Sequence, residues 1–188
     1  MAETRLVFLG APGSGKGTQA ERLSGRLGVP TVSTGEMLRS AVAVQNDLGR
    51  RVAEIMGSGD LVDDATMEAV VAERLDREDA RAGFILDGYP RTLVQAAALE
   101  GILADRDEEL DAVILIEVPE AELVRRALAR QREDDTEEVI RTRLEVYREK
   151  TEPLVRHYAE LGLLHRIDGH RSIDEVTEAI GTVLAVEV

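Results

Sequence analysis

The spacing of apolar residues along the chain changes repeatedly, and each change marks the border between two elements. Continuous apolar runs are typical of strands buried on both faces, whereas apolar residues three and four positions apart are typical of amphipathic helices. The apolar runs predict strands at 4–9, 30–33, 84–87, 112–118 and 163–167. The helical spacing predicts helices at 15–27, 35–45, 49–56, 64–77, 92–104, 120–129, 137–161 (bent at Pro153) and 173–186.

The alternation of strands and helices predicts a single α/β domain spanning residues 1–188. Repeated strand–helix units form a parallel sheet with helices on both faces, which gives three layers. Ligands of such sheets bind at the carboxyl ends of the strands. Gly10, Ser33, Asp87 and Val118 lie at or just past predicted strand ends, so we expect them to face one cleft.

A glycine-rich loop, GAPGSGKGT at 10–18, directly follows the first predicted strand. A strand, such a loop and a helix in succession let backbone N–H groups surround a polyphosphate, with the positive helix end and Lys16 adding charge. The chain has only two lysines, so a chance match to this pattern is rare. The loop predicts a nucleoside triphosphate site made by Gly13, Ser14, Gly15, Lys16, Gly17 and Thr18.

The residue after Lys16 departs from the usual phosphate loop. A serine or threonine hydroxyl normally follows the lysine and holds Mg²⁺. Here that position is Gly17, and Thr18 comes one residue later. We therefore expect looser contact with the metal, through water.

Composition and charge exclude several classes of function. The chain is 44% hydrophobic but only 3% aromatic, so the core must be mainly aliphatic. It contains no cysteine, which excludes disulfides, thiolate zinc sites and cysteine nucleophiles. A net charge of −14 argues against nucleic-acid partners, so arginines must converge locally if a polyanion binds. No signal peptide or membrane-length apolar run stands out, so we expect a cytoplasmic protein without membrane partners.

Four motifs in order resemble the adenylate kinase family, within the P-loop nucleoside monophosphate kinases. They read GAPGSGKGTQ, STGEMLR, GFILDGYPRT and RQREDD, and the resemblance runs from Leu6 to about Gly169. It implies a P-loop NTPase fold with a parallel five-stranded sheet, and reversible transfer of a phosphoryl group from MgATP to AMP. This reaction needs positioning and charge neutralisation more than a general base. Planar arginine forks suit such phosphate groups.

The resemblance assigns roles to the charged residues. It implies that Arg39 and Arg91 hold the AMP phosphate, and that Arg132 and Arg143 bridge acceptor and transferred phosphoryl. Arg130 would contact the ATP phosphates, and Arg126, or Arg125 beside it, would lie near the ATP adenine together with the backbone at Gly169. Asp87 would orient Mg²⁺ through water, and Asp134 and Asp135 would help to hold the lid arginines. The implied catalytic set is Lys16, Arg91, Arg130, Arg132 and Arg143.

The acceptor site follows from the same motifs. Thr34 and Gln95 match positions that read adenine, where related UMP/CMP kinases tend to have Ala and Asn. A site built to hydrogen-bond one base rejects others strongly, which favours AMP. The other implied AMP-binding residues are Asp60, Leu61, Val62, Gly88, Tyr89 and Pro90.

Two parts of the chain would move over a core formed by 1–32, 63–128 and 137–188. They are an AMP-binding segment at 33–62 and a lid at 129–136. Long-form relatives insert about thirty residues between the matches to Arg130 and Arg132, some with a zinc site, whereas this chain has only Gln131 there. The resemblance therefore implies a short lid, Mg²⁺ as the cofactor and no zinc.

Three other functions stay open at this point. A UMP/CMP kinase of the same fold would share the short lid, and a nucleotide sensor without turnover would share the phosphate loop. An ATPase acting on nucleic acid fits poorly with the acidic surface. The expected partners are ATP, AMP and ADP, bound by a monomer.

Overall fold

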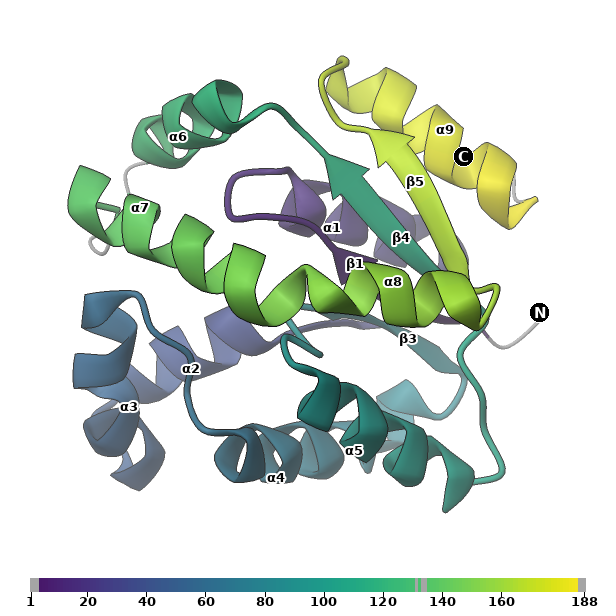
Figure 1. The fold of residues 1–188 in the computed structure, drawn as a ribbon. Coiled ribbons are helices and arrows are strands. Elements are labelled where there is room, and N and C mark those ends of the chain that lie inside the picture. Colours follow the sequence, from purple (N-terminus) through teal and green to yellow (C-terminus); the bar gives the residue numbers. More distant parts are fainter. Residues whose placement is uncertain (1–3, 131, 133–134, 186–188) are drawn as a thin grey trace.

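The computed structural model describes residues 4–130, 132 and 135–185. A five-stranded parallel sheet lies at its centre, with helices on both faces (Figure 1). The strands are β1 (Thr4–Leu9), β2 (Thr31–Ser33), β3 (Gly83–Asp87), β4 (Ala112–Glu117) and β5 (Leu164–Asp168). The helices are α1 (Lys16–Leu27), α2 (Thr34–Ala43), α3 (Asp47–Ser58), α4 (Asp64–Leu75), α5 (Leu93–Ala104), α6 (Glu120–Ala129), α7 (Glu137–Val146), α8 (Pro153–Glu160) and α9 (Ile173–Leu184), with short turns η1 (Glu78–Ala80) and η2 (Tyr147–Thr151).

The strand order β2-β3-β1-β4-β5 places the phosphate loop beside Asp87. In the parallel register Phe8 of β1 is opposite Asp87, and Ser33 of β2 is opposite the same residue from the other side. The loop that leaves β1, the end of β3 and the start of α2 therefore meet at one edge of the sheet. This arrangement confirms the predicted fold class. Of the four residues predicted to face one cleft, Gly10, Ser33 and Asp87 do so, whereas Val118 packs against the apolar clusters instead.

Alternate residues of the strands supply two separate cores because successive side chains point to opposite faces of a sheet. Leu6 and Phe8 face the core formed with α1 and α9. Val7 and Leu9 face the larger core, which contains residues of α2, α3, α4, α5 and α8. All four are at most 3% exposed. The sheet is thus rigidly held from both sides, which fixes the loops at its edge.

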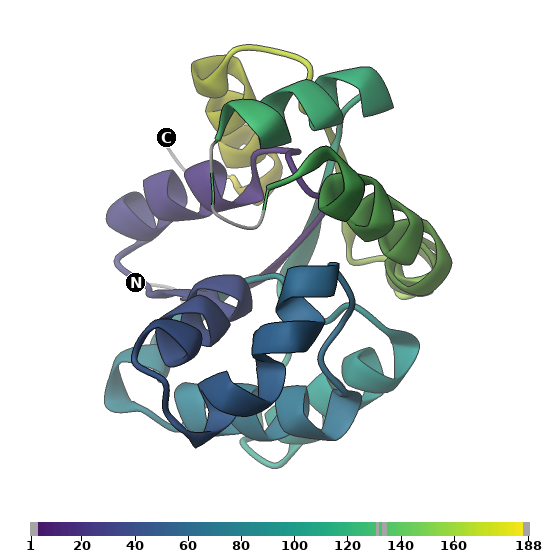
Figure 2. The same ribbon diagram turned by 90° about the vertical axis from the view of Figure 1, so that its left-hand side faces the viewer.

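Two helical pairs flank the phosphate loop on opposite sides. Figure 2 shows α2 and α3 below the loop, and α6 and α7 above it and beside it. A third apolar cluster joins the upper pair to the loop, with Ala11 packed among Leu123, Ala127, Ile140 and Leu144. Among the described residues, no helix combines the length and apolar character needed to cross a bilayer.

The long helix predicted from residue 137 differs from a simple bent helix. A π-helical turn, η2, lies between α7 and α8, and Pro153 is the first residue of α8 (Figure 1). The Glu152 N–H donates to the Tyr147 carbonyl at 2.9 Å, five residues back. Proline has no N–H for the regular ladder, and an inserted residue accommodates that gap.

Other differences concern element ends. α2 begins at Thr34 and α3 at Asp47, each slightly before its predicted start, and the 3₁₀ turn η1 was not predicted. Asp63 caps α4, since its carboxylate accepts from the Thr66 N–H at 2.9 Å.

Candidate active site

One cavity of about 740 Å³ opens at the carboxyl edge of the sheet. It brings together nearly all of the site residues that the sequence predicted, from both halves of the chain. They are Gly13, Ser14, Gly15, Lys16, Gly17, Thr18, Thr34, Arg39, Asp60, Leu61, Val62, Asp87, Gly88, Pro90, Arg91, Gln95, Arg126, Arg130, Arg132, Arg143 and Gly169. Of the residues assigned to ATP, AMP or Mg²⁺, Tyr89 differs, because its side chain is fully buried in the larger core; the buried Asp135 side chain also lies outside the cavity lining.

The phosphate loop has the backbone that its glycines predict. Gly13 has a φ of +88°, and a Cβ there would lie 2.6 Å from the Leu123 carbonyl oxygen, so only glycine fits. The loop ends at the start of α1, which leaves the first N–H groups of that helix directed at the cavity. The loop therefore presents backbone donors and a positive helix end to an anion.

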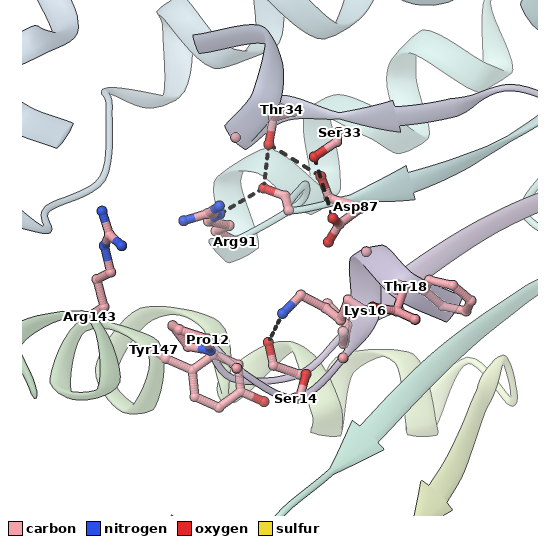
Figure 3. Close-up of a pocket in the computed structure, with 18 of the residues that line it drawn as sticks. Pro12, Ser14, Lys16, Thr18, Ser33, Thr34, Asp87, Arg91, Arg143 and Tyr147 are labelled. Atoms are coloured by element: carbon pink, nitrogen blue, oxygen red, sulfur yellow. Dashed lines mark hydrogen bonds between the residues drawn. The ribbon is translucent and has the colours of Figure 1, made fainter. Parts of the chain in front are cut away.

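Lys16 extends across this loop. Its Nζ donates to the carbonyl oxygens of Gly10 at 2.7 Å and Ala11 at 3.1 Å (Figure 3). Burial lowers the pKa of Lys16 to about 8; Asp87 opposes that shift, whereas Arg91, Arg130 and Arg132 add to it. A phosphate group would offset the repulsion among these cations.

Asp87 is the carboxylate nearest to the phosphate loop in the sheet register. The Ser33 hydroxyl lies 3.4 Å from its Oδ2, and a Cβ on Gly17 would lie 3.6 Å from the same oxygen. Among the described residues, no group of three or more His, Asp or Glu side chains could hold a metal by itself. One carboxylate beside a phosphate site fits Mg²⁺, which keeps several water ligands and shares substrate oxygens.

Arg91 is held at its side chain and at its backbone. Its Nε donates to the Gly88 carbonyl at 2.7 Å, and the same carbonyl accepts from the Thr34 hydroxyl at 2.9 Å. The Thr151 hydroxyl donates to the Arg91 carbonyl at 2.9 Å. Burial lowers the pKa of the Arg91 guanidinium, and Arg143 and Arg39 lie close enough to add to that effect, while Asp87 opposes it. Figure 3 shows Arg91 and Arg143 reaching into the cavity from opposite sides.

Asp135 joins Arg130 and Arg143. Its two oxygens accept from Arg130 Nε and Nη2 at 2.9 and 2.8 Å, and Oδ1 also accepts from Arg143 Nη1 at 3.2 Å. The Asp135 side chain is fully buried. The Arg132 N–H lies 3.4 Å from Oδ2 of the same carboxylate. One carboxylate therefore orients two guanidinium groups that come from different elements, and Asp134 lies outside the described residues.

Gln95 lines the cavity and is only 2% exposed. Its Oε1 accepts from the Arg91 N–H at 2.7 Å, and its Nε2 donates to Asp64 Oδ1 at 2.8 Å. Both ends of this amide are anchored within the chain.

The structure separates the neighbouring arginines of α6. Arg126 Nη1 donates to the Gly169 carbonyl at 3.1 Å, and its Nε donates to Glu122 at 2.7 Å. The Arg125 side chain is 70% exposed, and within the described part of the chain it pairs with Glu122. These hydrogen bonds, from Arg125 and then Arg126, lower the pKa of Glu122 to about 2. Arg126 is therefore the member of the pair that reaches the Gly169 loop.

Sequence reasoning missed three contributors to this site. Asp64 anchors Gln95, Thr151 binds the Arg91 carbonyl from η2, and Glu122 holds Arg126. The Glu122–Arg126 pair had a local signal, since residues four apart on a helix are neighbours. The other two contacts join residues that are 31 and 60 positions apart, and no sequence pattern predicts them.

The cavity thus combines a phosphate loop with a second cluster of arginines across from it, and comparison with known proteins identifies this combination. The family model described as adenylate kinase matches residues 8–163. The chain belongs to the adenylate kinase family. This membership confirms the predicted resemblance and makes the chain a nucleoside monophosphate kinase, a phosphotransferase.

Similar proteins named adenylate kinase come from both bacteria and archaea. The Nocardia farcinica protein is 52% identical over 93% of this chain and 95% of its own length. The Sinorhizobium medicae protein is 48% identical over 96% of this chain and its whole length. The Archaeoglobus fulgidus protein is 41% identical over 95% of this chain and 97% of its own. That alignment spans 210 positions, more than this chain's 188 residues, so the archaeal relative carries residues that this chain lacks.

Proposed function

We propose that this member of the adenylate kinase family transfers the terminal phosphoryl group of MgATP to AMP, reversibly, giving two ADP. The observation that carries the proposal is the convergence of Lys16 with a set of arginines on one cavity at the end of a phosphate loop. These arginines, which we call the clamp, are Arg39, Arg91, Arg130, Arg132 and Arg143. A protein of net charge −14 concentrates cations in this way where it must bind several phosphate groups.

The residues divide between the two nucleotides. The phosphate loop and Lys16 would hold the ATP phosphates, with Arg126 and the Gly169 backbone beside the donor base. Arg39 and Arg91 would hold the AMP phosphate at the other end. Arg130, Arg132 and Arg143 would lie between them and stabilise the charge that develops on the transferred group. No general base is needed because the acceptor is already a phosphate oxyanion.

The role of Asp135 follows from its contacts. Two arginine side chains that share one buried carboxylate are ordered before substrate arrives. Pre-ordered charge lowers the barrier because no reorganisation is needed in the transition state. Asp135 would therefore act as a positioning residue of the clamp.

Mg²⁺ with ATP is the proposed cofactor. When bound, it neutralises phosphate charge and orients the terminal phosphate. Asp87, together with the hydroxyls of Ser33 and Thr18 at the cavity wall, would hold its water ligands. Gly17 adds no hydroxyl, which is consistent with contact through water.

Closure of segment 33–62 and of the short lid 129–136 over the core is also part of the proposal, because a wet site would hydrolyse ATP. The contact between α3 and α7 supports it, since Arg143 Nη2 lies 3.4 Å from the Met56 carbonyl. We also propose that the protein acts as a monomer. The cytoplasmic location stays a prediction.

The test is a coupled assay of ADP formation with MgATP and, separately, AMP, UMP, CMP, GMP and dTMP. We expect fast turnover with AMP and little with the other acceptors. Preference for UMP or CMP would keep the clamp but overturn the assignment of Thr34 and Gln95 to adenine. No turnover with any acceptor, from protein that binds ATP, would favour a nucleotide sensor.

A further inference from the structure

Asp64 lies directly behind the proposed acceptor-base site, although it does not line the cavity itself. It is the first residue of α4. Its Oδ1 accepts two hydrogen bonds, from Gln95 Nε2 at 2.8 Å and from the Thr92 hydroxyl at 2.9 Å. The residue therefore connects the segment that follows the AMP-binding helices to the start of α5.

The contacts at the two ends of the Gln95 amide fix which way it faces. Oε1 accepts from the Arg91 N–H, and Nε2 donates to the Asp64 carboxylate. Rotation of the amide by half a turn would place its NH₂ against the Arg91 N–H and its oxygen against a carboxylate. Both new contacts would be repulsive. One amide N–H and one oxygen lone pair remain for a ligand, in a fixed order along the cavity wall.

That order matters for purine recognition. Adenine presents an amino donor next to a ring-nitrogen acceptor, whereas hypoxanthine carries a carbonyl acceptor where adenine has the amino group. An amide whose direction is locked can match only one of these patterns. An amide free to turn could match either.

We propose that Asp64 is a positioning residue that sets base selectivity at the acceptor site by locking the Gln95 amide in the direction that matches adenine. The inference rests on the proposed function, because it requires that Gln95 faces the base of AMP. It makes Asp64 a determinant of selectivity that never touches the substrate.

The test compares acceptor selectivity, the ratio of kcat/KM for AMP to that for inosine monophosphate, between the wild type and variants. D64A and D64S remove the acceptor that reaches Gln95, with serine suited to the start of a helix. D64N keeps a carbonyl oxygen at the same position. D63A is the matched control, because it removes the neighbouring carboxylate and the α4 cap while leaving Gln95 untouched. Thermal melting checks that each variant is folded.

We expect D64A and D64S to lower the selectivity ratio at least ~10-fold, the effect of losing one hydrogen bond to a charged group. D64N should restore most of the ratio, and D63A should melt at a lower temperature with the wild-type ratio. A purely structural role for Asp64 would lower activity with both nucleotides alike and leave the ratio unchanged.

Two results would overturn the inference. One is a wild-type ratio in both D64A and D64S, and the other is an equal loss of selectivity in D63A. In either case, wild-type turnover with AMP would leave the proposed function standing. A wild type that is inactive with AMP would overturn the proposed function and this inference together.

Discussion

Removal of the Asp135 carboxylate should slow phosphoryl transfer without unfolding the protein. In D135A the guanidinium of Arg130 loses two hydrogen bonds, at 2.9 and 2.8 Å, and Arg143 loses one at 3.2 Å. Hydrogen bonds to charged groups contribute about 1.5–3 kcal/mol each in favourable cases. The two arginine side chains are 30% and 18% exposed, so water replaces part of the loss. The interactions that order Arg130 and Arg143 are then weakened by about 3 kcal/mol in total. If that loss raises the activation free energy of transfer by the same amount, kcat falls roughly 10²-fold.

The chain offers a matched control for this experiment. Arg74 donates to Asp79 through two hydrogen bonds, at 2.9 and 2.8 Å, away from the residues that line the cavity. D79A removes the same chemistry and should leave kcat unchanged. Both variants are assayed for ADP formation at saturating MgATP and AMP, and their melting temperatures are compared. If D135A keeps a kcat within about threefold of the wild type, or if D79A loses as much, Asp135 does not order the clamp for phosphoryl transfer.

Three further predictions concern the ATP side of the site. Above about pH 8 the protein should take up a proton when ATP binds. Lys16 is then largely neutral because burial lowers its pKa to about 8, and the bound phosphates raise that pKa again. Calorimetry in buffers of different ionisation enthalpy measures this uptake, and K16M should abolish both it and transfer. R126A should raise the KM for ATP in steady-state kinetics, whereas R125A should not, because only Arg126 reaches the Gly169 loop. G169A should destabilise the fold by about 1–3 kcal/mol in denaturant titrations, since its Cβ would lie 2.4 Å from Ile116 Cγ2.

Much of the fold could be read from the sequence because its strands are buried on both faces. The stretches 6–9 and 112–116 are continuous and apolar, which favours central parallel strands. The π-helical turn before Pro153 could not be predicted from the sequence in this way. The proline indicates only that the regular ladder breaks. The form of the break goes with long-range contacts, the Thr151 hydrogen bond to the Arg91 carbonyl and the packing of Leu154 in the larger core.

The candidate site could likewise be predicted from the sequence only in part. Motifs predicted which residues gather, and those assigned to ATP, AMP or Mg²⁺, except Tyr89, line one cavity. The choice between Arg125 and Arg126 could not be made from motifs, because two adjacent helical residues differ only in the direction they face. That direction has meaning only once Gly169, more than forty residues away, is in place.

The sequence by itself determined the phosphate loop, since strand, glycines, lysine and helix are consecutive and their conformations depend on local sterics and backbone hydrogen bonding. Only the tertiary structure decided that Asp135 serves both Arg130 and Arg143, and that Asp64 anchors Gln95. Such contacts join segments whose approach is set by the packing of two cores on the sheet. Their geometry is a property of the whole fold, and no local stretch of sequence encodes it.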